Sequence, residues 1–166
     1  MAEIKFKGNP VHTQGQLPEV GSAAPDFKLT NTDLGEVSLG DFNGKRVVLN
    51  IFPSVDTGIC AMSVRRFNEL AGSMDNTAVI NVSKDLPFAH KRFCGAEGIE
   101  NVVSTSSFRD PEFSSRYGVD MVDGPLAGLM SRAVVVLDEN GVVKYTEQVP
   151  DITQEPDYDN ALSALK

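Results

Sequence analysis

The stretch VVLNIFPSVDTGICAMSVRRFNELAG, residues 47–72, changes its hydrophobic pattern in the middle and thereby decides the fold. Residues 47–52 are apolar on both faces, which is typical of a buried central strand. Further on, apolar side chains recur every three or four residues, at Cys60, Val64, Phe67 and Ala71. That period predicts an amphipathic helix, and Gly72 is placed to end it. A buried strand that leads through a short loop into a helix indicates an α/β protein.

The rest of the chain continues this alternation. Further buried strands are expected over 78–83 and 133–137, and Glu139-Asn140-Gly141 is a hairpin turn into a strand over 142–148. Shorter elements are expected at the start, as a hairpin over 4–13 and a strand over 27–29. Helices are expected over 87–93, with proline at the start and Gly95 just past the end, and over 111–117 and 156–166.

The order of these elements predicts a thioredoxin-like fold. In it a central mixed β-sheet is flanked by helices, and a short N-terminal β-hairpin precedes the sheet. The sequence contains no internal repeat, low-complexity tract or flexible linker, so we expect a single domain over residues 1–166.

The composition excludes several classes of function. The 166 residues carry a net charge of −8, which argues against binding to nucleic acid or to an anionic membrane. The N-terminus lacks the apolar core of a signal peptide, and no stretch approaches the roughly 18 apolar residues of a membrane span. We therefore expect a cytoplasmic protein. His12 and His90 have no suitably spaced partners, so neither a metal site nor a cofactor is expected.

Cys60 is the leading candidate for a reactive group. It is expected in the first turn of its helix, where free backbone N–H groups and the positive end of the helix dipole favour a thiolate. Thr57, three residues earlier, can cap the helix, and its hydroxyl is within one turn of the sulfur. The alternative interpretation is that Cys60 is a small core residue, because it lies on the apolar stripe of the helix.

Two further residues are candidates for helping Cys60. Cys94 lies 34 residues downstream, at the expected end of the 87–93 helix, where the dipole disfavours a thiolate. This spacing matches neither a C-x-x-C redox motif nor a zinc site. Arg132 directly precedes the strand over 133–137 and could stabilise a thiolate there. The alternatives are a buried structural cysteine and a solvated surface arginine.

Several motifs resemble one known family. The pattern P-x-x-x-T-x-x-C, formed by Pro53, Thr57 and Cys60, matches the active-site signature of the peroxiredoxins. The longer run NIFPSVDTGIC, residues 50–60, resembles the thiol peroxidase branch of that family. So do DLPFAHKRFCGAEG (85–98), DGPL (123–126), RAVVV (132–136) and EPDY (155–158). The resemblance extends over essentially the whole chain.

The resemblance implies an atypical 2-Cys peroxiredoxin that reduces hydrogen peroxide and organic hydroperoxides in antioxidant defence. It implies that Cys60 is the peroxidatic nucleophile, Cys94 the resolving cysteine of an intrachain disulfide, and thioredoxin the reductant. Thr57 and Arg132 would activate the thiolate, and Pro53 would shield it. A homodimer is also implied. Phe88, Phe93, Leu129 and Met130 are either pocket-lining or core residues.

Two classes of function remain open at this stage. The leading hypothesis is a peroxidase enzyme that turns over repeatedly. The rival is a redox sensor in which the Cys60–Cys94 pair controls a partner protein after one oxidation. A disulfide oxidoreductase is disfavoured because the C-x-x-C motif is missing.

Overall fold

A seven-stranded mixed β-sheet forms the centre of the protein, for which a computed structural model describes residues 2–165. Its strand order is β4-β3-β7-β6-β5-β8-β9. The strands are β3 (Lys28–Asn31), β4 (Glu36–Ser38), β5 (Arg46–Ile51), β6 (Thr77–Ser83), β7 (Val103–Ser106), β8 (Ala133–Leu137) and β9 (Val143–Gln148). β5, β6 and β7 are parallel, and the outer strands pair antiparallel. This is the predicted thioredoxin-like sheet.

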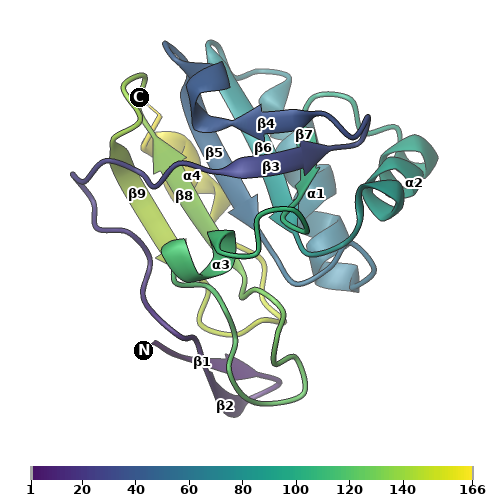
Figure 1. Cartoon of the computed structure of the whole chain (residues 1–166), viewed down its shortest axis with the longest axis vertical. Coiled ribbons are helices and arrows are strands. Elements are labelled where there is room, and N and C mark those ends of the chain that lie inside the picture. The colour runs from purple at the N-terminus through teal and green to yellow at the C-terminus, as the bar shows by residue number, and fades with distance from the viewer. Residues whose placement is uncertain (1, 166) are drawn as a thin grey trace.

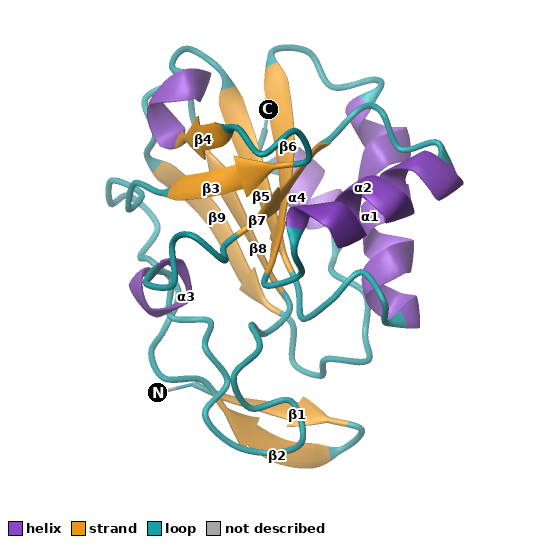
Figure 2. Cartoon of the chain, turned by 45° about the vertical axis from the view of Figure 1, so that its right-hand side comes forward, coloured by secondary structure: helices purple, strands orange, loops and turns teal. Residues whose placement is uncertain are grey.

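Helices lie on both faces of the sheet (Figures 1 and 2). They are α1 (Gly58–Ala71), α2 (Pro87–Glu97), α3 (Phe113–Arg116) and α4 (Tyr158–Ser163), with a 3-10 turn η1 over Leu39–Phe42. In Figure 2, α1 and α2 lie to one side of the strands and α3 lies to the other. None of the helices in the described part of the chain is long and apolar enough to cross a membrane.

Alternation along the central strands explains the two layers. Because successive side chains of a strand point to opposite faces, Val47 and Leu49 of β5 join a cluster with α3, while Val48 joins a cluster with Phe67 of α1 and Ala161 of α4. All five are nearly or fully buried. The continuous apolar run that predicted a buried strand is therefore a strand covered on both faces.

The hairpin of β1 (Glu3–Phe6) and β2 (Asn9–His12) lies apart from the main sheet, at the lower end of Figure 1. The segment after β9 holds it in place, because Lys5 N donates to Pro150 O at 2.8 Å and Ile152 N donates to Lys5 O at 2.9 Å. The Asp151 carboxylate also accepts from Gly8 N at 3.1 Å. These bonds tie the start of the chain to residues 150–152.

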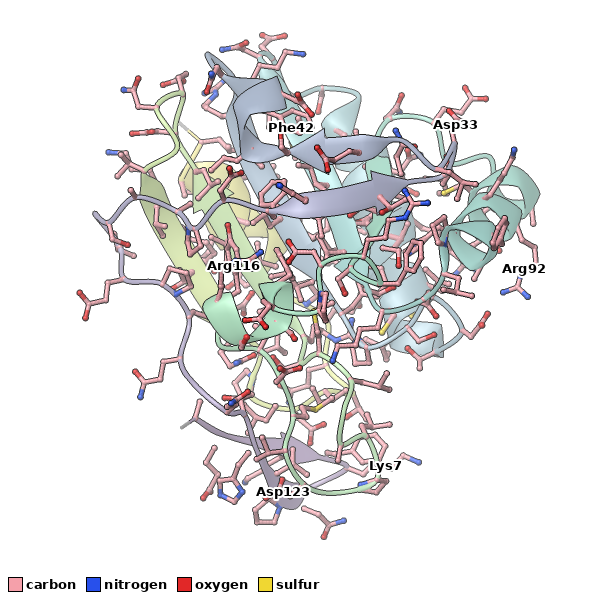
Figure 3. The ribbon with its side chains drawn as sticks, viewed as in Figure 1. Lys7, Asp33, Phe42, Arg92, Arg116 and Asp123 are labelled. Carbon is pink, nitrogen blue, oxygen red and sulfur yellow. The ribbon has the colours of Figure 1, made fainter. Side chains whose placement is uncertain are left out.

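A pH-dependent contact anchors the other side of the hairpin. His12 Nδ1 lies 2.7 Å from Asp123 Oδ2, and the hydrogen bond to Asp123 raises the pKa of His12 above its ordinary 6.5. Figure 3 shows Asp123 at this end of the molecule. A raised pKa in the folded state means that the contact stabilises the fold fully below pH 6.5 and loses this effect as the pH rises through the folded-state pKa.

We therefore expect the melting temperature of the wild type to fall, relative to that of His12→Gln, as the pH rises from about 5 to about 9. Thermal unfolding of both proteins across this range measures the difference. The control repeats the His12→Gln comparison in an Asp123→Asn background. Without the Asp123 carboxylate, most of the pH dependence of the difference in melting temperature should disappear. A gap that does not change with pH would contradict the assignment.

Three details of the fold differ from the prediction. The second helix does not end before Gly95 but continues to Glu97, and it ends at Gly98, whose φ of 66° is left-handed. Cys94 therefore lies inside the last turn rather than beyond the helix. The last helix is shorter than expected. β4, β7 and η1 were not predicted, because these short segments carry no clear apolar alternation.

Candidate active site

Cys60 occupies the first turn of α1, directly after the loop that leaves β5. Its side chain is fully buried and packs against Phe52, Val55 and Val64. Thr57 stands at the predicted N-cap position of α1, but its side chain makes no capping hydrogen bond. Its hydroxyl, however, donates to Ser54 O at 3.1 Å and makes no recorded hydrogen bond to the sulfur. The interpretation of Cys60 as a core residue therefore describes its burial correctly. Whether the sulfur of Cys60 is reactive depends on the other groups that contact it.

Arg132 provides that contact. Its Nη2 donates to the Sγ of Cys60 at 3.1 Å, and its Nε donates to Ile152 O at 3.0 Å. The side chain is only 1% exposed, so the alternative of a solvated surface arginine is wrong. A buried guanidinium is costly unless a negative group lies beside it. Of the two groups to which Arg132 donates, only the Cys60 sulfur can carry a negative charge.

One nitrogen of the Arg132 guanidinium also stays unpaired. Its Nη1 is buried and has no hydrogen-bond partner among the described residues. An unsatisfied buried donor is costly and is common where a ligand supplies the missing acceptor. The guanidinium can therefore hold the sulfur with one nitrogen and still donate to an oxygen of a bound molecule with another.

The pocket beside this pair has a volume of about 280 Å³. Pro53, Thr57 and Arg132 contribute to its lining, so the structure brings three predicted site residues together. The apolar part of the wall comes from Phe6, Ile59, Leu126 and Ile152. None of the four residues suggested from the sequence lines this pocket: Phe93 packs in the cluster around Cys60, Met130 is in the main core, Leu129 packs against the apolar side chains of the hairpin, and Phe88 is exposed.

Cys94 lies in the last turn of α2 and is a free thiol, as is Cys60. It is half-buried and packs against the cluster that contains Cys60. Its Sγ lies 3.3 Å from Ser104 Oγ of β7. Burial raises the pKa of Cys94, and the bond to Ser104 opposes this only in part. A raised pKa keeps Cys94 a protonated thiol at neutral pH.

A row of buried polar side chains runs beneath both cysteines. Asn50, Asn81 and Ser104 are register partners on adjacent strands and are linked by hydrogen bonds of 3.0 Å and 3.4 Å. Ser104 contacts Cys94 at one end, and at the other Asn50 contacts Ser63, whose hydroxyl donates to Cys60 O at 2.8 Å. The sequence analysis did not predict this row. Its signal was Asn50 and Asn81, each a polar residue within an otherwise apolar strand.

Comparison with known proteins places this geometry in a family. The family model described as Redoxin matches residues 19–162. The chain is 57% identical to the thiol peroxidase of Corynebacterium glutamicum and 59% identical to that of Mycobacterium tuberculosis, over 99% of each chain. The chain belongs to the thiol peroxidases of the redoxin family. It is accordingly an enzyme of the thiol-dependent peroxidase class.

Solved structures of redoxin relatives agree with this fold. The peroxiredoxin-like protein from Aquifex aeolicus superposes with a TM-score of 0.93 at 38% identity, over 99% of this chain and 96% of that one. A thiol peroxidase from Chromobacterium violaceum shares the fold at a TM-score of 0.91, with 24% identity and coverage of 98% and 94%. The predicted family and the predicted fold are both confirmed.

Proposed function

We propose that the protein reduces hydroperoxides through a sulfenic acid on Cys60 and an intrachain disulfide with Cys94. The contact between Arg132 Nη2 and Cys60 Sγ, at 3.1 Å beside a pocket, is the observation that carries this proposal. In the first step the thiolate attacks the outer oxygen of the O–O bond. Cys60 becomes a sulfenic acid, the O–O bond breaks, and the alkoxide takes a proton to leave as an alcohol.

Each neighbour has a proposed role in this step. Arg132 stabilises the thiolate, and its free Nη1 donates to the departing oxygen as negative charge develops there. Thr57 lines the pocket, where its hydroxyl can turn from Ser54 O to the peroxide. Pro53 is buried and offers no N–H, so it shields the sulfur from water.

In the second step, Cys94 attacks the sulfenic sulfur and releases water, which leaves a Cys60–Cys94 disulfide. The two cysteines come from different helices, and a disulfide needs Cα atoms within about 7 Å. We propose that segments near Cys60 and around 88–98 unfold locally to allow it. Thioredoxin then reduces the disulfide and restores both thiols. Superposable structures of the reduced and disulfide forms would contradict the local unfolding.

The apolar wall of the pocket supports organic hydroperoxides as the preferred substrates. Phe6 and Leu126 reach it from the hairpin and from the loop before β8. We expect Leu126→Ser to lower kcat/KM for cumene hydroperoxide about 5- to 30-fold, because apolar contact of this size is worth roughly 1–2 kcal/mol. The value for hydrogen peroxide should change less than twofold. Steady-state kinetics with both peroxides checks this, and an equal loss for both would contradict an apolar binding wall.

We further propose that the chain acts as a single domain over residues 1–166, in the cytoplasm, and as a homodimer. The lack of an internal linker in the sequence supports the single domain, and the family resemblance supports the homodimer. Sedimentation of the reduced protein tests the dimer.

Turnover distinguishes the enzyme from the sensor. The test measures NADPH consumption with thioredoxin, thioredoxin reductase and cumene hydroperoxide. Sustained consumption that is lost in Cys60→Ser supports the peroxidase cycle, and a single stoichiometric oxidation supports the sensor. Intact mass after one equivalent of peroxide should show the loss of two hydrogens, as expected for one intrachain disulfide.

A further inference from the structure

The Asp85 carboxylate, just after β6, holds the loop that leads to Cys60. One oxygen accepts from Ser54 Oγ at 2.7 Å, and the other accepts from Val55 N at 2.9 Å and from Ser83 Oγ at 2.5 Å. Ser54 and Val55 directly follow Pro53 and come just before the helix cap. Three donors on one half-buried carboxylate make a strong, charge-assisted junction between segments 30 residues apart.

The same junction continues into the helix that carries Cys94. Ser83 Oγ lies 2.9 Å from Nε2 of His90, which is buried in α2 one turn before Cys94. Burial lowers the pKa of His90, so its ring is neutral at neutral pH. A neutral ring that donates from Nε2 to Ser83, which in turn donates to Asp85, gives one continuous chain of hydrogen bonds, and Nδ1 of His90 stays buried without a partner among the described residues. Asp85 thus joins the Cys60 loop to the first turns of α2.

The only other recorded polar link between this loop and α2, within residues 2–165, is weak. Arg92 Nη2 lies 2.7 Å from Asp56 Oδ1, but both side chains are more than 60% exposed. Figure 3 shows Arg92 on the outer side of α2. Exposed ion pairs of this kind contribute little to stability. Among the polar contacts that position the loop relative to α2, those of Asp85 are therefore the strongest.

We propose that Asp85 is a positioning residue that latches the 53–57 loop around Cys60, and that this latch opens before Cys60 and Cys94 join. The inference rests on the proposed two-cysteine cycle. The closed latch holds Pro53 and Thr57 at the pocket and so speeds the attack on the peroxide. The same closed latch slows the second step, because the Cys60 loop and α2 have to separate for the disulfide to form.

Asp85→Asn tests this with little change in shape, because the amide matches the carboxylate in size but carries no charge, so the hydrogen bonds from Val55 N and Ser83 Oγ lose their charge assistance. In a Cys94→Ser background, where only the first step occurs, we expect sulfenic acid to form about 10- to 100-fold more slowly, the range typical of a small misplacement of catalytic groups. With Cys94 present, the step from sulfenic acid to disulfide should become faster. Less Cys60 should then reach the sulfinic acid that a second peroxide produces.

Asp138→Asn is the matched control. Asp138 also accepts backbone hydrogen bonds, from Asn140 N at 2.8 Å and Val142 N at 3.0 Å, but it lies in the turn between β8 and β9. It should leave both steps unchanged. Ser54→Ala, which removes one donor only, replaces Asp85→Asn if that variant does not fold.

Opposite changes in the two rates support the latch. Equal slowing of both steps, or rates like those of Asp138→Asn, would overturn it. Rapid mixing with intact mass measures each step separately. If Cys94→Ser with an intact Asp85 formed no sulfenic acid at all, the proposed function would fail instead, so the two failures are distinguishable.

Discussion

Replacing Cys60 with serine is expected to lower the rate of peroxide reduction at least about 1000-fold, as the loss of a catalytic nucleophile does in other enzymes. A serine hydroxyl is a much weaker nucleophile than a cysteine sulfur in the same position beside Arg132. Serine is close to cysteine in volume, and it can still accept the hydrogen bond from Arg132 Nη2. The fold should therefore survive. Consumption of cumene hydroperoxide in the thioredoxin-coupled assay measures the loss.

Cys94→Ser is the informative control for this variant. It should still consume about one equivalent of peroxide per chain, because Cys60 and Arg132 are untouched, but it should not turn over with thioredoxin. Thermal unfolding of all three proteins confirms that they are folded. If Cys60→Ser kept the burst while Cys94→Ser lost it, the assignment of the two cysteines would have to be reversed.

Substitution of Arg132 is expected to cause the second large loss of peroxide reactivity. Arg132→Lys should lower the second-order rate constant for peroxide about 100- to 1000-fold, the range found when one donor to a developing oxyanion is lost. A single ammonium group cannot reproduce the fork that bonds Ile152 O, the Cys60 sulfur and a peroxide oxygen together. Stopped-flow measurement of Cys60 oxidation, in which reductant plays no part, isolates this step.

The thiolate content of Arg132→Lys distinguishes a direct effect on Cys60 from a general structural defect. If Arg132 acts on the sulfur, Arg132→Lys should also contain less Cys60 thiolate at neutral pH, which is measurable by its ultraviolet absorbance. Arg65→Lys is the matched control, because Arg65 is an exposed α1 arginine that pairs with Glu97 at 2.8 Å. It should change the rate less than twofold. Equal losses in both variants would argue against a direct role for Arg132.

Local features of the sequence predicted one half of the site and could not predict the other. Pro53, Thr57 and Cys60 lie on one strand–loop–helix junction, so their proximity follows from the change in hydrophobic period. Arg132 lies 72 residues from Cys60, and only the pairing of β5 with β8 brings them together. No periodicity reports such a contact. The resemblance to a family identified Arg132, whereas residue physics alone favoured a surface position.

The pocket wall and the end of the second helix also depend on features that local sequence patterns do not report. Phe6 reaches the pocket because the hairpin docks on residues 150–152, a contact between the two ends of the chain. Gly95 and Gly98 are both plausible helix terminators, and only the backbone shows that Gly98 adopts the left-handed conformation. β7 was missed because its residues, VSTS, are mostly polar, although three of the four are buried.

The docking of the hairpin on residues 150–152 has a consequence for synthesis on the ribosome. The first strand emerges early, but its partner segment emerges only near the end of translation, about 7 to 30 s later at typical elongation rates. Arg132 loses its fixed position without that segment, because Ile152 O holds its Nε. A nascent chain without that segment therefore lacks the bond that fixes Arg132 beside Cys60. We expect the proposed peroxide chemistry to begin only when residues 150–152 have docked on the hairpin.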